Sequence, residues 1–166
     1  ADGSVRDGLS LLDQAISLTG GDIGESGVHE MLGLADRSQS FTMLEAVLKG
    51  EIVTALRVLA DQYEAGADPA RILQDLLEII HWVTRLKVAP DAAKDPGVSE
   101  TERVMGTDMA KCLSMAALAR AWQMLLKGLG EIKTAPRPLQ AVEMILIRLA
   151  FAADLPTPVE ALKALE

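Results

Sequence analysis

Apolar residues recur at intervals of three and four positions along most of this chain, and that spacing constrains the fold more than any other feature. The first set is Val5, Leu9, Leu12 and Ile16, which would share one face of a helix. Residues 72–86 repeat the spacing over a longer stretch. Alternation of apolar and polar residues, the pattern of a half-buried strand, is not sustained over even five residues. The chain is therefore predicted to be all-α.

Composition supports a helical core and excludes several classes of protein. Hydrophobic residues make up 49% of the chain but aromatic residues only 3%, so the core must be mainly aliphatic. The single cysteine excludes an internal disulfide framework and a cysteine-rich zinc module. The formal net charge of −8 argues against a surface that coats nucleic acid. No apolar run reaches the length of a membrane span, and no segment resembles a signal peptide.

Glycine, proline and N-cap residues divide the periodic pattern into separate helices. Gly20-Gly21, Gly33, Gly50 and Gly66 are typical stops, and Asp68-Pro69 is a typical start, with an N-cap acid before a proline in the first helical position. Trp122 is predicted to pack in the core, and Cys112 to be buried or half-buried. The predicted helices cover about residues 4–19, 25–32, 38–49, 51–65, 69–88, 99–111, 115–133 and 139–153, with a last short one from 158.

Glycine and charge are distributed unevenly, which indicates two parts. Seven of the 13 glycines lie in the first 33 residues, and residues 1–35 hold six acids against one base. Residues 99–166 are balanced, with eight of each. We expect a small acidic module over residues 1–35 and a larger helical bundle over residues 36–166.

Arg6 lies in the first turn of the first predicted helix, where two interpretations are open. A helix N-terminus together with an arginine can bind an anion such as a phosphate. Alternatively, Arg6 pairs with Asp2 or another surface acid. The residues alone do not separate the two.

A family resemblance favours the phosphate. The segment Gly3–Ile16, GSVRDGLSLLDQAI, resembles the sensor-2 segment in the lid of AAA+ clamp loader subunits, the gamma/tau family of bacterial DNA polymerase III above all. The segment Val28–Gly33 is similar to the next lid helix, and Ala141–Leu149 to a late helix of the collar domain. The resemblance implies that residues 1–35 are the C-terminal part of an AAA+ lid and that residues 36–166 are the oligomerisation collar.

The same resemblance implies a role for each part. Arg6 would reach the γ-phosphate of ATP, bound with magnesium in the full-length protein, and Val5 would pack beside the nucleotide. The collar would hold further copies of this subunit and subunits of the delta and delta-prime type. The assembled ring would load a sliding clamp onto primer–template DNA in the bacterial cytoplasm. Polymerase and helicase would bind a C-terminal region that is absent here, and no membrane is involved.

These residues alone are not expected to form an enzyme. The sequence has no G-x-x-x-x-G-K-[ST] loop to hold phosphates, and no catalytic or metal-binding set is predicted. The start at Ala1, without an initiator methionine, is interpreted as a cut through a longer protein, an ATPase subunit of DNA polymerase III. Two alternatives stay open: a free-standing helical adaptor, and a metal-carboxylate enzyme, for which only Glu78–His81 has the required E-x-x-H spacing.

Overall fold

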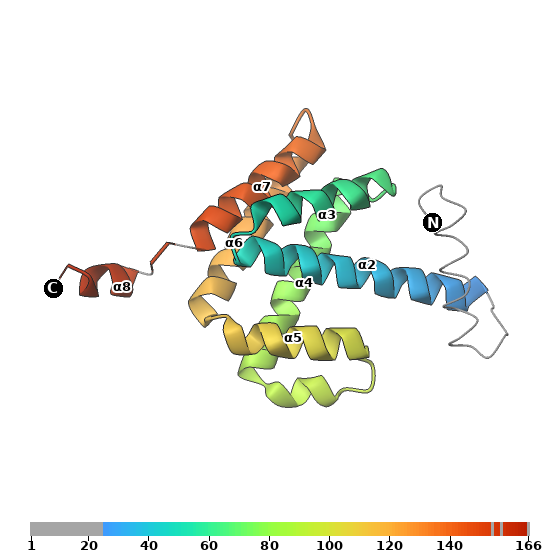
Figure 1. Cartoon of the computed structure of the whole chain (residues 1–166), viewed down its shortest axis with the longest axis horizontal. Helices are drawn as coiled ribbons and strands as arrows, with labels where there is room; N and C mark the ends of the chain where they lie inside the picture. Colours follow the sequence, from blue (N-terminus) through green and yellow to red (C-terminus); the bar gives the residue numbers. More distant parts are fainter. Residues whose placement is uncertain (1–24, 154, 157, 166) are drawn as a thin grey trace.

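The computed structural model describes residues 25–153, 155–156 and 158–165, and all regular secondary structure in this part of the chain is helical, as predicted. The first predicted helix, over residues 4–19, lies outside the described residues. Seven α-helices and one 3-10 helix are present in the described part (Figure 1). They are α2 (Glu25–Leu48), α3 (Ile52–Glu64), α4 (Pro69–Val88), η1 (Pro90–Lys94), α5 (Glu100–Cys112), α6 (Met115–Ile132), α7 (Pro138–Ala153) and α8 (Pro158–Lys163).

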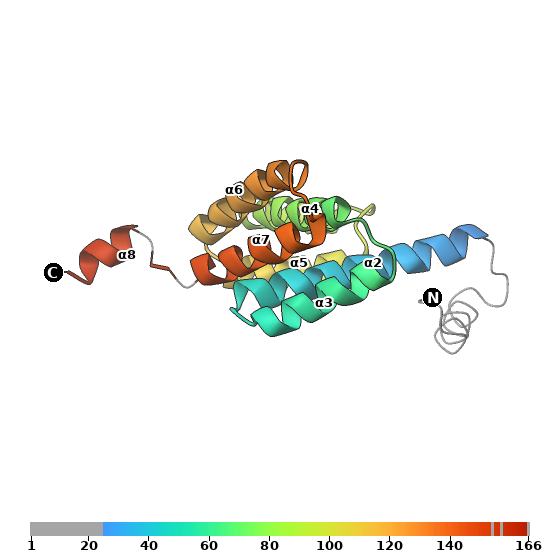
Figure 2. The same ribbon diagram turned by 90° about the horizontal axis from the view of Figure 1, so that it is seen from above.

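Helix α4 is the centre of the bundle and packs against α2, α5, α6 and α7 (Figures 1 and 2). Its start is as predicted, since the Asp68 carboxylate accepts a hydrogen bond of 3.1 Å from the Arg71 backbone N–H. The side chains of Leu73, Leu76 and Ile80 are fully buried. The core around them is aliphatic, and Phe41 is the one buried aromatic ring among the described residues.

Short turns join α2 to α3, α3 to α4 and α6 to α7, and the first and last of these pairs pack side by side. Gly50, with φ of 78°, lies between α2 and α3, and Gly66, with φ of 97°, follows α3. Both backbones are left-handed, which glycine adopts without the steric cost of a Cβ. The predicted stops at these two glycines are therefore confirmed.

The predicted break at Gly33 is wrong, because α2 is one helix of 24 residues that passes through this position. An isolated glycine inside a helix costs only about 1 kcal/mol relative to alanine and does not end it. A C-terminal stop needs the chain to leave the helix, usually with a positive φ, and Gly33 is not among the glycines that have one. The stretch between the predicted helices over residues 69–88 and 99–111 contains the short helix η1.

The two halves of α2 have different surroundings. Phe41, Met43, Leu44 and Val47 in the second half are fully buried against the bundle, whereas Val28 in the first half is exposed. Figures 1 and 2 show the first half extending beyond the other helices. At the opposite end of the molecule, α8 also stands apart from the bundle.

Candidate functional site

The predicted nucleotide contacts, Arg6 and Val5, lie outside the described residues, so their positions stay a prediction. What the structure does show is the bundle to which they would be attached. Three features of its surface can carry interactions: a charged cluster on α2, α4 and α5, a hollow between α2 and α5, and an apolar stripe on α6.

The charged cluster is centred on Arg37, where α2 enters the bundle. Its Nε donates a hydrogen bond of 3.0 Å to Glu102 on α5, and its Nη1 donates one of 3.2 Å to Glu78 on α4. The guanidinium also lies over the Phe41 ring, 5.9 Å from its centroid. Because the Arg37 side chain is only 20% exposed, solvent screens these contacts less than a pair at the open surface.

Glu102 is held in place by the start of its own helix. Its backbone N–H donates to Ser99 Oγ at 3.3 Å, and its carboxylate accepts from the Ser99 backbone N–H at 3.3 Å, which forms a capping box. Trp82 Nε1 donates a hydrogen bond of 3.1 Å to the backbone carbonyl of Glu102. A Cβ added at Gly106 would lie 2.6 Å from the same nitrogen of Trp82, so α5 and α4 are in close contact here.

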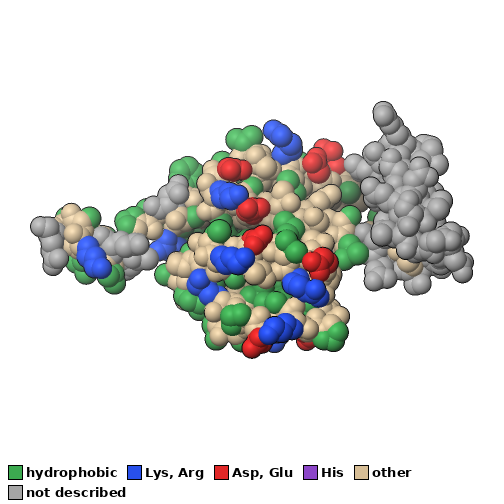
Figure 3. Space-filling model, turned by 60° about the horizontal axis from the view of Figure 1, so that its bottom comes forward, with side chains coloured by type: hydrophobic (Ala, Val, Ile, Leu, Met, Phe, Trp, Pro, Cys, Tyr) green, Lys and Arg blue, Asp and Glu red, His purple; other side chains and the backbone are tan. Residues whose placement is uncertain are grey.

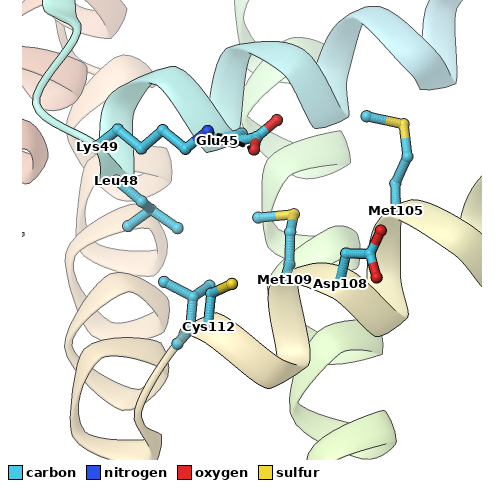
Figure 4. A pocket seen from close by; sticks show the side chains of 8 residues that line it. Glu45, Leu48, Lys49, Met105, Asp108, Met109 and Cys112 are labelled. Carbon is cyan, nitrogen blue, oxygen red and sulfur yellow. Dashed lines mark ion pairs between the residues drawn. The ribbon is translucent and has the colours of Figure 1, made fainter.

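The hollow lies between the end of α2 and α5 and has a volume of about 250 Å³. Leu48 and Met109 line its apolar floor, and Glu45 pairs with Lys49 at 2.7 Å on its rim (Figure 4). Cys112 also lines the hollow and is exposed, so its predicted burial is wrong. Cys112 is the last residue of α5.

The apolar stripe runs along the outer face of α6. Met115, Ala119, Trp122 and Leu126 follow one another at helical spacing, and all four are exposed. Trp122 is 38% exposed and lies near His81 of α4, with ring centroids 6.5 Å apart. Its predicted place in the core is therefore wrong. Because the neighbouring face of α6 buries Leu118, Ala121 and Leu125, this helix is apolar on two adjacent sides, which is typical of an interaction surface.

Three groups in the described part have shifted pKa values. Burial raises the pKa of the Asp75 carboxyl, and the coulombic attraction of Arg71 opposes that rise. A hydrogen bond from Arg148 lowers the pKa of Glu131, and a hydrogen bond to Glu45 raises the pKa of Lys49. The shifts of Glu131 and Lys49 follow from surface ion pairs, whereas that of Asp75 follows from its partial burial.

The described residues offer no metal site, because no three His, Cys, Asp or Glu side chains gather there. None of their helices combines the length and hydropathy needed to cross a bilayer. Figure 3 shows acidic, basic and hydrophobic side chains interspersed over one face of the bundle. That face has no continuous basic stripe of the kind that follows a nucleic-acid backbone.

Residues 23–165 match the family described as DNA polymerase III subunits gamma and tau domain III. The chain belongs to this family. Residues 1–21 match a second family, described as the ATPase lid domain of the DNA polymerase III clamp loader subunit. The resemblance to the gamma/tau family is therefore confirmed.

Individual relatives of this gamma/tau chain agree. It is 31% identical to the DNA polymerase III subunit tau of Salmonella typhimurium over 95% of its length, and to that of Escherichia coli at the same identity and coverage. It is 28% identical to subunit tau of Bacillus subtilis over 94%. The chain spans only about a quarter of each of these proteins, 24% of the first two and 28% of the third.

A solved structure shares the fold. The DNA clamp loader delta protein of Bacillus subtilis superimposes on 91% of the gamma/tau chain with a TM-score of 0.63, and the match covers 48% of that protein. The sequence identity is 15%, so the likeness concerns the helical architecture.

Sequence reasoning missed the cluster around Arg37. The capping box at the start of α5 could have been predicted, because Ser99 and Glu102 have the S-x-x-E spacing that is typical before a helix. The pairing of Arg37 with Glu102 joins residues 65 positions apart, and no local pattern indicates it.

Proposed function

We propose that this chain joins subunits of the replication clamp loader through the bundle α2–α7 and couples that assembly to ATP through Arg6. The observation that carries the proposal is the order of the two family matches, lid over residues 1–21 and gamma/tau domain III over residues 23–165. A lid segment directly before a helical domain of this family is the arrangement of an AAA+ subunit that ends its nucleotide-binding part and begins its collar.

The proposed division is a lid part over residues 1–35 and a collar over residues 36–166. The burial pattern of α2 supports a collar that begins near residue 36, because its buried positions start at Ser40. The family matches change over at residue 22 and favour an earlier boundary. Since α2 is continuous from Glu25 to Leu48, it would extend from the lid into the collar and transmit a lid rotation to the bundle.

In the intact protein, Arg6 would contact the γ-phosphate of ATP bound with magnesium, and Val5 would pack beside the nucleotide. Arginine suits this role because its guanidinium keeps its charge and offers several donors to phosphate oxygens. ATP hydrolysis would belong to the full-length parent, since phosphoryl transfer needs several groups placed together. We assign no catalytic group to residues 1–166.

The proposed partners are further copies of this subunit and delta-type and delta-prime-type subunits, held through the collar in the bacterial cytoplasm. The ring they form would load a sliding clamp onto primer–template DNA. Polymerase and helicase would be bound by a C-terminal region beyond this chain. The apolar stripe on α6 supports a collar that contacts neighbouring subunits, because an exposed apolar face of this length is usually covered in an assembly.

The proposal is tested with Arg6→Ala in the full-length protein. ATP-dependent clamp loading should fall by at least about tenfold, as with the loss of an arginine that contacts a transferring phosphate. Assembly, measured by size-exclusion chromatography of the complex, should be unchanged. Arg57→Ala on the exposed face of α3 is the matched control and should affect neither.

A loading rate in Arg6→Ala equal to the wild type would refute the ATP contact. Failure of the wild-type protein to assemble with clamp loader subunits would refute the proposed function as a whole and favour a free-standing adaptor.

A further inference from the structure

Helix α8 has an apolar face with no partner in the part of the chain that the structure describes. Val159 and Leu162 share one side of the helix and are 61% and 66% exposed, and Leu155 before it and Leu165 after it are exposed as well. No other helix of the described chain packs against α8 (Figures 1 and 2).

A helix of this length requires support from outside. Isolated helices shorter than about 12 residues are marginal in water, and α8 has six residues. Its valine and leucine side chains would also remain in contact with solvent. Burial of this face against another surface would supply both the missing stability and the missing partner.

The stripe on α6 has the properties that such a segment needs. Met115, Ala119, Trp122 and Leu126 extend over about 16 Å at the helical rise of 1.5 Å per residue. The small Ala119 lies between the larger side chains of Met115 and Trp122, so an incoming leucine can approach the helix backbone there.

Charge favours α6 over the hollow between α2 and α5. Residues 154–166 hold three acids and one base, whereas residues 115–133 hold three bases and one acid. The hollow is lined by Glu45, Lys49 and Asp108, and because Lys49 is paired with Glu45, it offers no net positive charge to an acidic segment.

We propose that α8 of one copy docks on the α6 stripe of a second copy of this chain, with Leu162 packed beside Leu126. The orientation of α8 supports docking in trans, because it points away from its own bundle (Figures 1 and 2). The contact joins two different surfaces of the chain, so it repeats from copy to copy as the contacts of a ring do. This inference rests on the proposed function and assigns the collar a contact surface.

Cysteine cross-linking between copies tests the docking. Cys112→Ser is combined with Leu162→Cys in one chain and with Leu126→Cys in another, and the two full-length chains are mixed and oxidised. A disulfide-linked dimer of the two variants is expected. The matched control replaces Leu126→Cys with Val53→Cys on α3, whose side chain is 70% exposed, and should give no dimer.

Two results would overturn the inference. One is the absence of a 162–126 disulfide at concentrations where the wild-type chain associates or is held in the assembled complex. The other is a 162–126 disulfide that forms within one chain when both cysteines are present, since α8 would then dock on its own α6.

A charge variant separates this inference from the proposed function. Leu162→Glu should weaken self-association by at least about tenfold, with circular dichroism unchanged because α8 supports no other helix. Val53→Glu is the control. If Leu162→Glu self-associates and enters the clamp loader as well as the wild type, the docking of α8 is wrong while the proposed function stands.

Discussion

Arg37 on α2 donates a hydrogen bond of 3.0 Å to Glu102 on α5, and the two residues are 65 positions apart in the sequence. Because the same guanidinium also reaches Glu78 on α4, one side chain connects three helices at the point where α2 leaves the bundle. The region after α4, from η1 through α5, is thereby attached to α2 as well as to α4.

Removal of this connection should weaken the attachment of α5. Arg37→Ala is expected to lower the free energy of unfolding by about 1–2 kcal/mol, because it removes two charge-assisted hydrogen bonds at a half-buried site. Urea denaturation measures this change, and hydrogen exchange should show faster opening of α5 than of α7.

Lys94→Ala is the matched control, since Lys94 pairs only with Asp91 in an ion pair that is more than 80% exposed. We expect the free energy of unfolding of this variant to lie within about 0.5 kcal/mol of the wild-type value. Equal effects of the two substitutions would mean that Arg37 contributes no more than a surface pair.

The contact of α6 with α7 depends on the absence of a side chain at Gly128. A Cβ there would lie 2.6 Å from Ile145 Cδ1, and Ile145 is buried and β-branched, so it cannot move aside easily. Gly128→Ala should therefore destabilise the protein by about 1–3 kcal/mol in thermal or urea unfolding.

Gly130→Ala lies two residues further along α6 and has no atom within 4 Å of the added Cβ. This variant should be neutral or gain up to about 1 kcal/mol from helix propensity. A loss of stability at position 130 equal to that at position 128 would show that the spacing of α6 and α7 is not the cause.

The continuity of α2 can be tested at Gly33. Gly33→Ala meets no atom within 4 Å and should stabilise the helix by up to about 1 kcal/mol. Gly33→Pro removes a backbone donor from the helix interior and should kink α2 at a cost of about 3 kcal/mol, largely outside the bundle core.

In the full-length protein, Gly33→Pro should reduce ATP-dependent clamp loading while assembly persists, whereas Gly33→Ala should leave both unchanged. Clamp loading by the proline variant at the wild-type rate would argue against transmission of lid movement through α2.

The ion pair between Glu131 and Arg148 predicts a dependence of stability on pH. The folded-state pKa of Glu131 is below its ordinary value, so the pair stabilises the fold when the carboxyl is ionised in both states. That contribution is lost as the pH falls below about 4.5, the ordinary value, and through the lowered pKa. The stability difference between wild type and Glu131→Gln should be largest near pH 7 and should vanish near pH 2, as measured by urea unfolding. An unchanged difference at low pH would exclude the pair as its cause.

Sequence reasoning predicted the features that local chemistry determines. The start of α4 at Asp68-Pro69 and the turns at Gly50 and Gly66 follow from capping and from the steric freedom of glycine, and all are present. Gly33 was wrongly predicted to end a helix because the prediction rested on the glycine alone. A glycine is tolerated inside a helix when the flanking residues continue it, as they do in α2.

Burial could be predicted only where one face of a helix dominates. The inward residues of α4 were found because its apolar period is regular. Trp122 was misplaced because α6 is apolar on two sides, and the sequence does not show which side meets α4 and α7. The cluster around Arg37 depends on packing between distant helices, which spacing along the chain does not encode.

The place of α7 in the bundle has a consequence for biosynthesis. This helix, which packs against α2, α3, α4 and α6, follows the end of α3 by more than 70 residues. At translation rates of about 5–20 residues per second, α7 is completed on the order of ten seconds after α3. Until then, the apolar surface of α2 and α3 that α7 covers has no partner. Throughout that interval the nascent chain presents the parts of α2 and α3 that α7 will cover to the ribosome surface and to chaperones, so folding quality in the cell depends on events before the last helix is made.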